Sequence, residues 1–190
     1  MIEFDEKGYC IIRGFLDSVA VSTVSRYMEY RIKQNGKEYQ DPTSKYSFYA
    51  DPLMETILYN SKVDIEEICG KKLDPTYSYS RVYVKGDKLK KHIDRPSCEI
   101  SVSVNVAISS DKPWSIWCQY KNNDPVECAL QPGDAVVYKG CEVYHWRDPL
   151  EHADLNAQFM LHYVDKNGLN ASYKWDRRPS LGMLSNTKGL

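Results

Sequence analysis

Apolar positions follow a helical period up to residue 73 and a strand-like alternation after it. The clearest helix is predicted from Asp17 to Gln34, where one face carries the apolar residues Val24, Tyr27, Met28 and Ile32. Asp51 followed by Pro52 has the form of a helix start, and another short helix is predicted at 63–69. A first strand is predicted at 2–13. Residues 1–73 are therefore expected to be mostly a helical support.

Strict alternation begins in the stretch 77–85. One face of this predicted strand carries three tyrosines and an arginine, which are Tyr77, Tyr79, Arg81 and Tyr83. In the next long strand, Glu99–Ile108, small polar residues such as Ser101 and Ser103 lie opposite an apolar face. Arginine among aromatic residues is unusual for a simple core, so we interpret these faces as walls of a polar cavity.

Further short strands are predicted at 114–120, 126–130, 135–138, 142–146 and 156–164, and 166–190 is expected to be a tail. About eight short strands behind a helical front are typical of a mainly β fold with flanking helices. We therefore predict a double-stranded β-helix (jelly roll) with N-terminal helices packed on one sheet. A single domain over 1–190 is expected, with its jelly-roll core at 74–165.

Charge and cysteine content narrow the class of protein. The sequence has 25 Lys+Arg and 26 Asp+Glu, a formal net charge of −1, so no basic excess favours nucleic acid as a partner. There is no apolar run that would span a bilayer and no leader after Met1, so a soluble, cytoplasmic protein is expected. The six cysteines form no Cys-X-X-Cys pair, which favours reduced, mostly buried thiols.

The chemistry that the sequence offers is centred on His92 and Asp94. On a strand these two side chains point to the same face. With His145 as a third ligand they would form a two-histidine, one-carboxylate set, which is typical of non-haem Fe(II) oxygenases. The pair alone is also compatible with a solvated strand end, in which Asp94 pairs with a neighbouring cation such as Arg95. His152 is the competing third ligand, in what reads as a loop.

The order of these elements resembles the Fe(II)/2-oxoglutarate-dependent dioxygenases, especially the prolyl-hydroxylase-like and phytanoyl-hydroxylase-like branches. The resemblance covers about Tyr9–Val164 and depends mainly on His92-X-Asp94, the turn Pro132–Asp134 and His145. It implies that His92, Asp94 and His145 hold Fe(II). It also implies that 2-oxoglutarate and O₂ are consumed, with ascorbate as an additive that activity can require, and that a substrate is hydroxylated while succinate forms.

The sequence departs from the family where the far carboxylate of 2-oxoglutarate should be bound. The family places an arginine or lysine about ten residues past the distal histidine, and Leu155 stands there. A buried dianion requires a cation, so Arg81 or Arg147 is expected to take this role. Hydrogen bonds are expected from Tyr83, Ser103 and Gln158. For Arg95 an ion pair with Glu99 or another nearby acid is expected, and for His162 a structural role.

Two other functions stay open at this point. A metal-binding jelly roll with chemistry that does not use 2-oxoglutarate would bind a metal without forming succinate. A non-catalytic binding module would hold metal weakly and would tolerate the loss of His92. The sequence does not identify the substrate; a prolyl residue of a peptide or a small molecule would suit this scaffold, and no membrane partner is expected. The helix at 17–34 is compatible with a homodimer.

Overall fold

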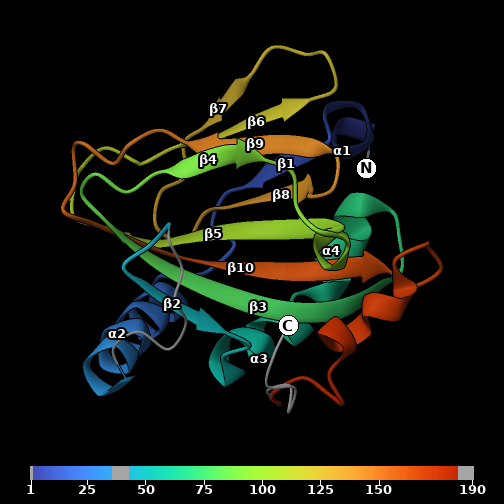
Figure 1. Cartoon of the computed structure of the whole chain (residues 1–190), viewed down its shortest axis with the longest axis horizontal. Coiled ribbons are helices and arrows are strands. Elements are labelled where there is room, and N and C mark those ends of the chain that lie inside the picture. Colours follow the sequence, from blue (N-terminus) through green and yellow to red (C-terminus); the bar gives the residue numbers. More distant parts are fainter. Residues whose placement is uncertain (1, 36–42, 184–190) are drawn as a thin grey trace.

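Two antiparallel β-sheets form the body of the protein (Figure 1), whose computed structural model describes residues 2–35 and 43–183. The larger sheet, in the order β1-β8-β5-β10-β3-β2, contains β1 (Tyr9–Ile12), β2 (Tyr46–Tyr49), β3 (Leu73–Val84), β5 (Ile100–Ile108), β8 (Ala135–Lys139) and β10 (Leu155–Asp165). The smaller sheet, in the order β4-β9-β6-β7, contains β4 (Leu89–His92), β6 (Ile116–Tyr120), β7 (Val126–Cys128) and β9 (Val143–Arg147). The predicted double-stranded β-helix is confirmed.

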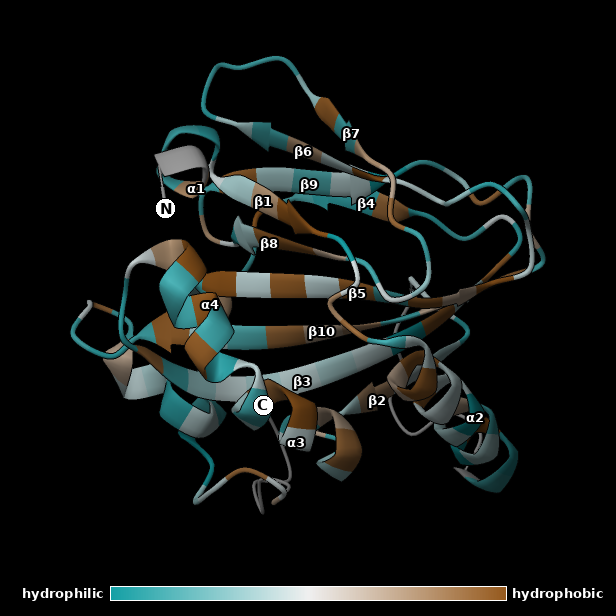
Figure 2. Cartoon of the chain, turned by 180° about the vertical axis from the view of Figure 1, so that it is seen from behind, coloured by the Kyte–Doolittle hydropathy of each residue, from teal (hydrophilic) through white to brown (hydrophobic). Residues whose placement is uncertain are grey.

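The helices lie against the outer face of the larger sheet (Figure 2). They are α1 (Ile2–Lys7), α2 (Ser18–Asn35), α3 (Pro52–Asn60) and α4 (Lys62–Cys69), and two short 3₁₀ segments follow, η1 (Pro96–Cys98) and η2 (Ala171–Arg177). Apolar residues from the helices and the sheet form one cluster, including Val24, Met28, Leu58, Ile65, Val102 and Phe159. Burial of this apolar surface fixes the helices on the sheet.

The predicted helix starts are confirmed. A carboxylate oxygen of Asp17 accepts the backbone N–H of Ala20 at 2.8 Å, and one of Asp51 accepts that of Leu53 at 3.0 Å. Gly70 ends α4 with a φ of 66°, a left-handed conformation that glycine adopts without strain. None of the helices in the described part of the chain is long and apolar enough to cross a bilayer.

The predicted strand at 2–13 is wrong in its first half, where the chain forms α1. Phe4 is 1% exposed and packs into the core from this helix. Gly8 then turns the chain with a φ of 75° and donates its N–H to the carbonyl of Phe4 at 2.9 Å. Ile2 and Phe4 alternate as the residues of a strand would, and two apolar positions within six residues do not distinguish a helical turn from a strand, so only the packing of Phe4 decides it.

The stretch after β10, expected to be a tail, instead folds back onto the body as far as Met183. Arg178 is buried there and forms an ion pair with the buried Glu55 of α3. It also donates to the backbone carbonyls of Thr76, Trp175 and Met183. A long-range pair of this kind leaves no periodic pattern in the sequence, which is why the expectation failed.

Candidate metal centre

The larger and smaller sheets enclose a cavity of about 780 Å³, and His92, Asp94 and His145 meet on its wall. His92 ends β4 and lies directly opposite His145 of β9 in the sheet register. Asp94 follows just after β4, where its backbone N–H donates to the carbonyl of Gly140 at 2.8 Å. Its Oδ1 is 3.6 Å from Nε2 of His92 and 3.5 Å from Nε2 of His145. The three predicted ligand atoms therefore converge on one point.

Backbone contacts orient both imidazoles for metal binding. Nδ1 of His92 is 2.8 Å from the carbonyl of Lys90, and Nδ1 of His145 is 3.1 Å from the carbonyl of Val143. A carbonyl can only accept, so Nδ1 carries the hydrogen in each ring. The lone pairs are then on the two Nε2 atoms, which face Asp94. This donor set fits a divalent transition metal, with the histidine tautomers already selected.

The second oxygen of Asp94 is held from the other side. Ser101 donates its hydroxyl to Oδ2 at 2.8 Å, and the same hydroxyl lies 2.9 Å from Nδ1 of His162. Gly140 packs directly behind this carboxylate, since an added Cβ there would lie 2.7 Å from Oδ2. The carboxylate therefore has little freedom to rotate. His162 is buried on β10 and bonded to Ser101, and the structural role expected for it stays a prediction.

The protonation states of Asp94 and His145 suit a metal. Burial alone would raise the pKa of Asp94, but its contact with His92 and the nearby charges lower it below the ordinary value. Burial lowers the pKa of His145, whereas the contact with Asp94 raises that of His92. Burial also lowers the pKa of His162, to about 4. An ionised carboxylate beside a neutral imidazole is the state that binds a cation.

Arg147 adds a buried cation to the same cavity. Its side chain donates to Oε1 of Gln158 at 2.6 Å and to the carbonyl of Trp114, and its guanidinium lies 5.0 Å from the centre of the Trp114 ring. Within the described residues, Nε of Arg147 has no hydrogen-bond partner, and no carboxylate forms an ion pair with its guanidinium. Burying a cation without a counter-charge is costly. This arrangement fits an anionic group bound in the cavity.

The other predicted cosubstrate residues also line this cavity: Arg81, Tyr83, Ser103 and Gln158. Arg81 donates to the hydroxyl of Tyr83 at 3.1 Å and stacks on Tyr79 at 5.1 Å. Ser103 reaches Gln158 at 3.5 Å. The structure thus brings the predicted set together, while the roles of these residues in binding 2-oxoglutarate stay predictions. His152 lies elsewhere, exposed, with Nε2 3.2 Å from the carbonyl of Lys112.

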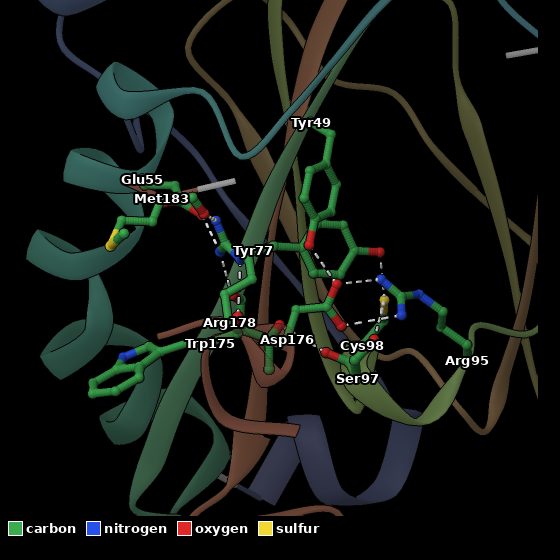
Figure 3. Close-up of polar contacts among 11 residues, drawn as sticks. Tyr49, Glu55, Tyr77, Arg95, Ser97, Cys98, Trp175, Asp176, Arg178 and Met183 are labelled. Carbon is green, nitrogen blue, oxygen red and sulfur yellow. Dashed lines mark hydrogen bonds and ion pairs between the residues drawn. The ribbon is translucent and has the colours of Figure 1, made fainter. Parts of the chain in front are cut away.

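The sequence did not reveal the residues that close the cavity beside Tyr77. Tyr49 of β2 and three residues after β10, Tyr173, Asp176 and Arg177, also line it. Figure 3 shows the carboxylate of Asp176 between Tyr49 and Arg95. This carboxylate accepts hydrogen bonds from both terminal guanidinium nitrogens of Arg95, at 3.1 and 2.9 Å, and from the Tyr49 hydroxyl at 2.5 Å. The acid that pairs with Arg95 is therefore Asp176 and not Glu99.

An unusual backbone places these residues. Trp175, Asp176 and Arg177 all have positive φ, between 54° and 61°. Non-glycine residues in this left-handed conformation each cost about 1–3 kcal/mol and persist only where contacts on both sides hold them. Here the contacts are the Asp176–Arg95 pair on one side and the buried Arg178–Glu55 pair on the other. The sequence has no run of glycine or asparagine here that would have predicted this turn.

Comparison with solved structures identifies the fold. A Pseudomonas putida prolyl-4-hydroxylase aligns with a TM-score of 0.67 at 13% identity, covering 85% of this chain and 95% of that one. HygX from Streptomyces hygroscopicus, solved with nickel and 2-oxoglutarate, aligns with a TM-score of 0.68 at 11% identity, covering 87% and 86%. A 2OG-Fe(II) oxygenase family oxidoreductase from Burkholderia pseudomallei gives a TM-score of 0.69 at 16% identity, covering 88% and 90%.

These neighbours share the fold but little sequence. No protein-family model matches this sequence, and no curated protein is similar to it at the level of sequence. The chain therefore has the fold of the Fe(II)/2-oxoglutarate oxygenases, as the resemblance implied, and a candidate His-Asp-His triad within it. A fold alone does not fix a reaction, so the activity depends on the residues of the site.

Proposed function

We propose that this protein is an Fe(II)- and 2-oxoglutarate-dependent oxygenase. The observation that carries the proposal is the placement, in one cavity, of the His92–Asp94–His145 donor set and the buried, uncompensated Arg147. The donor set suits Fe(II), and a guanidinium suits a carboxylate. When bound, the iron and 2-oxoglutarate together supply the oxidation of a C–H bond with O₂, with succinate and CO₂ as co-products.

The work of this chain's own residues follows from their positions. His92, Asp94 and His145 would occupy three metal positions on one side and leave the rest free towards the cavity. Arg147 lies two residues after His145 on the same strand, so its side chain points to the same face. It would hold the far carboxylate of 2-oxoglutarate, with Gln158 fixing the guanidinium and Tyr83 and Ser103 beside it. Arg147 would thereby take the place of the cation that the family carries at the position of Leu155.

The substrate side of the cavity is shaped by Tyr49, Tyr77, Tyr79, Tyr173 and the turn at Asp176. A volume of about 780 Å³ accommodates the cosubstrate together with a small molecule or a single side chain of a peptide. Two of the structural neighbours are prolyl hydroxylases, which favours a prolyl residue as one class to test. We infer that the enzyme hydroxylates such a residue or a small molecule.

The test is succinate formation from 2-oxoglutarate in the presence of Fe(II), ascorbate and air, with no added substrate. Wild type is compared with His145→Ala, and with His152→Ala as a matched control because His152 is an exposed histidine outside the cavity. Slow succinate formation by wild type and His152→Ala, and its loss in His145→Ala, are expected. Metal binding without any succinate would instead favour a jelly roll with other chemistry. Succinate formation that survives in His145→Ala would remove His145 from the metal site.

A further inference from the structure

A buried thiol and a buried phenol touch beside the metal centre, and the proposed function gives neither of them a chemical role. The hydroxyl oxygen of Tyr77 lies 3.0 Å from Sγ of Cys98, and the two residues are 8% and 2% exposed. Tyr77 belongs to β3 and Cys98 ends η1, which begins two residues after Asp94. The contact therefore joins the wall of the cavity to the segment that carries the metal-binding carboxylate.

The neighbouring residues hold these two segments together. Thr76 donates its hydroxyl to the backbone carbonyl of Ser97 at 2.8 Å, so the residues just before Tyr77 and Cys98 are bonded to each other. The backbone N–H of Cys98 also donates to the carbonyl of Arg95 at 2.9 Å. The contact between the two side chains is thus fixed by the backbone on both sides.

The ring of Tyr77 is enclosed as well (Figure 3). Its centre is 5.1 Å from that of Tyr49 and 4.5 Å from that of His162, and the guanidinium of Arg95 lies 4.7 Å over it. Arg95 is itself held by the two hydrogen bonds to Asp176. The phenol ring is therefore held between Tyr49 and His162, with its hydroxyl shared between Cys98 and the guanidinium of Arg95.

The pair lies close to the place where oxidation would occur. A carboxylate oxygen of Asp94, Sγ of Cys98 and a ring nitrogen of His162 all lie within 4.8 Å of one another. Burial raises the pKa of Cys98 to about 12 and also raises that of Tyr77, so both groups keep their hydrogens. A protonated, buried thiol resists ordinary oxidation from solvent, and the reaction open to it is with its neighbour inside the cavity.

We propose that Tyr77 and Cys98 become joined by a thioether bond between Sγ and the ring carbon next to the phenol carbon. The inference rests on the proposed function, which supplies the oxidant. The S–H bond of Cys98 and one ring C–H bond of Tyr77 break, and one S–C bond forms. O₂ is the oxidant. One of its oxygen atoms takes up the two hydrogens and their electrons and leaves as water, and the other is incorporated as 2-oxoglutarate is converted to succinate and CO₂. One 2-oxoglutarate and one O₂ are thus consumed for each cross-link.

The cross-link has a structural consequence for the site. It ties β3 covalently to η1, within four residues of Asp94, and fixes the Tyr77 wall of the cavity. Unlike a disulfide, an S–C bond is not reversed by thiols. The modification is therefore a single, permanent event in the life of each chain, and it precedes repeated turnover of a substrate.

The test is the mass of the protein before and after reaction. Protein prepared without iron is incubated with Fe(II), 2-oxoglutarate and air and is then treated with a reducing agent. Its intact mass is measured by mass spectrometry. We expect wild type to lose the mass of two hydrogen atoms per chain. After tryptic digestion, the peptides Leu73–Arg81 and His92–Lys121 should appear as one linked species. Succinate is measured in the same samples.

Three variants assign the bond. Cys98→Ser and Tyr77→Phe should each keep the unmodified mass, and the former also excludes Cys118, which lies in the same peptide. Cys141→Ser is the matched control and should still lose two hydrogens. Its thiol lies 3.4 Å from the carbonyl of Arg95, in the same region as Cys98.

The proposal is overturned by an unchanged wild-type mass while succinate forms, which leaves the proposed function intact. Added oxygen in place of lost hydrogen, or a mass change that the reducing agent reverses, also overturns it, because these indicate simple thiol oxidation or a disulfide. If neither succinate nor the mass change appears, the proposed function fails together with the cross-link.

Discussion

Ser101 donates its hydroxyl to Oδ2 of Asp94 at 2.8 Å, so that the other oxygen, Oδ1, is the one turned towards His92 and His145. Residues that orient a metal ligand commonly contribute tenfold or more to metal affinity. We therefore expect Ser101→Ala to weaken Fe(II) binding by about 10- to 100-fold. Anaerobic titration with Fe(II) measures this. Ser103→Ala is the control, because Ser103 lies on the same strand but contacts Gln158, at 3.5 Å, and this variant should bind the metal normally. Equal Fe(II) affinities of the two variants would contradict the role of Ser101.

Arg147→Gln should weaken 2-oxoglutarate binding while leaving metal binding in place. Losing one partner of a buried, hydrogen-bonded charge pair costs about 2–5 kcal/mol, which corresponds to a rise of roughly 30-fold or more in the KM for 2-oxoglutarate. The measurement is succinate formation at varied 2-oxoglutarate with saturating Fe(II). Arg26→Gln, which removes an exposed surface pair with Glu29, is the control. An unchanged KM in Arg147→Gln would move the carboxylate site to another residue.

Arg178→Met should destabilise the whole fold, although Arg178 lies outside both sheets. Its guanidinium and the carboxylate of Glu55 are both fully buried, at 0% and 2% exposure. Breaking such a pair from one side leaves an uncompensated charge and costs about 3–5 kcal/mol. Urea unfolding measures this, and adding Glu55→Gln to Arg178→Met should recover part of the loss. Additive losses in the double variant would show that the two charges do not compensate each other.

The acid stability of the fold should depend on Glu66. Burial alone would raise its pKa, but the backbone N–H of Leu73 and the ammonium groups of Lys72 and Lys62 lower it to about 2. A depressed pKa in the folded state means that the stabilisation is present above the ordinary value of 4.5 and is lost as the pH falls towards 2.

Glu66→Gln should therefore unfold more easily than wild type at neutral pH, and the difference should vanish at the acid end of this range. The exposed neighbour Glu67, changed to Gln, serves as the control and should show no such pH dependence. The measurement is the free energy of unfolding in urea across the pH range. A difference between Glu66→Gln and wild type that stayed constant with pH would contradict this origin of the stability.

Part of the site could be predicted because its geometry is local. His92 and Asp94 are two residues apart, and the alternation of an extended chain is enough to bring their side chains to one side. Arg147 follows His145 by the same spacing, so the sequence already made it one of two candidates for the cation. The Tyr77–Tyr83 face was predicted as a cavity wall for the same reason, and all of its residues line the cavity.

What depends on distant contacts could not be predicted in this way. The partner of Arg95 is Asp176, 81 residues further on, and that of Arg178 is Glu55, 123 residues back. Neither pair has a period, a cap or a turn that marks it in the sequence. The helix at Ile2–Lys7 was also missed, since it is specified by the burial of Phe4 rather than by a repeating pattern.

The sequence by itself determined most of the element order between residues 50 and 165, the double-stranded β-helix and the candidate metal ligands, because alternation, caps and turn residues act over a few neighbouring positions. Only the tertiary structure decided how the cavity is arranged. It decided which oxygen of Asp94 faces the histidines, which arginine is buried without a counter-charge, and where the chain after β10 closes the cavity wall. These depend on packing and long-range hydrogen bonds, whose free energy belongs to pairs of residues that the chain brings together only when it folds.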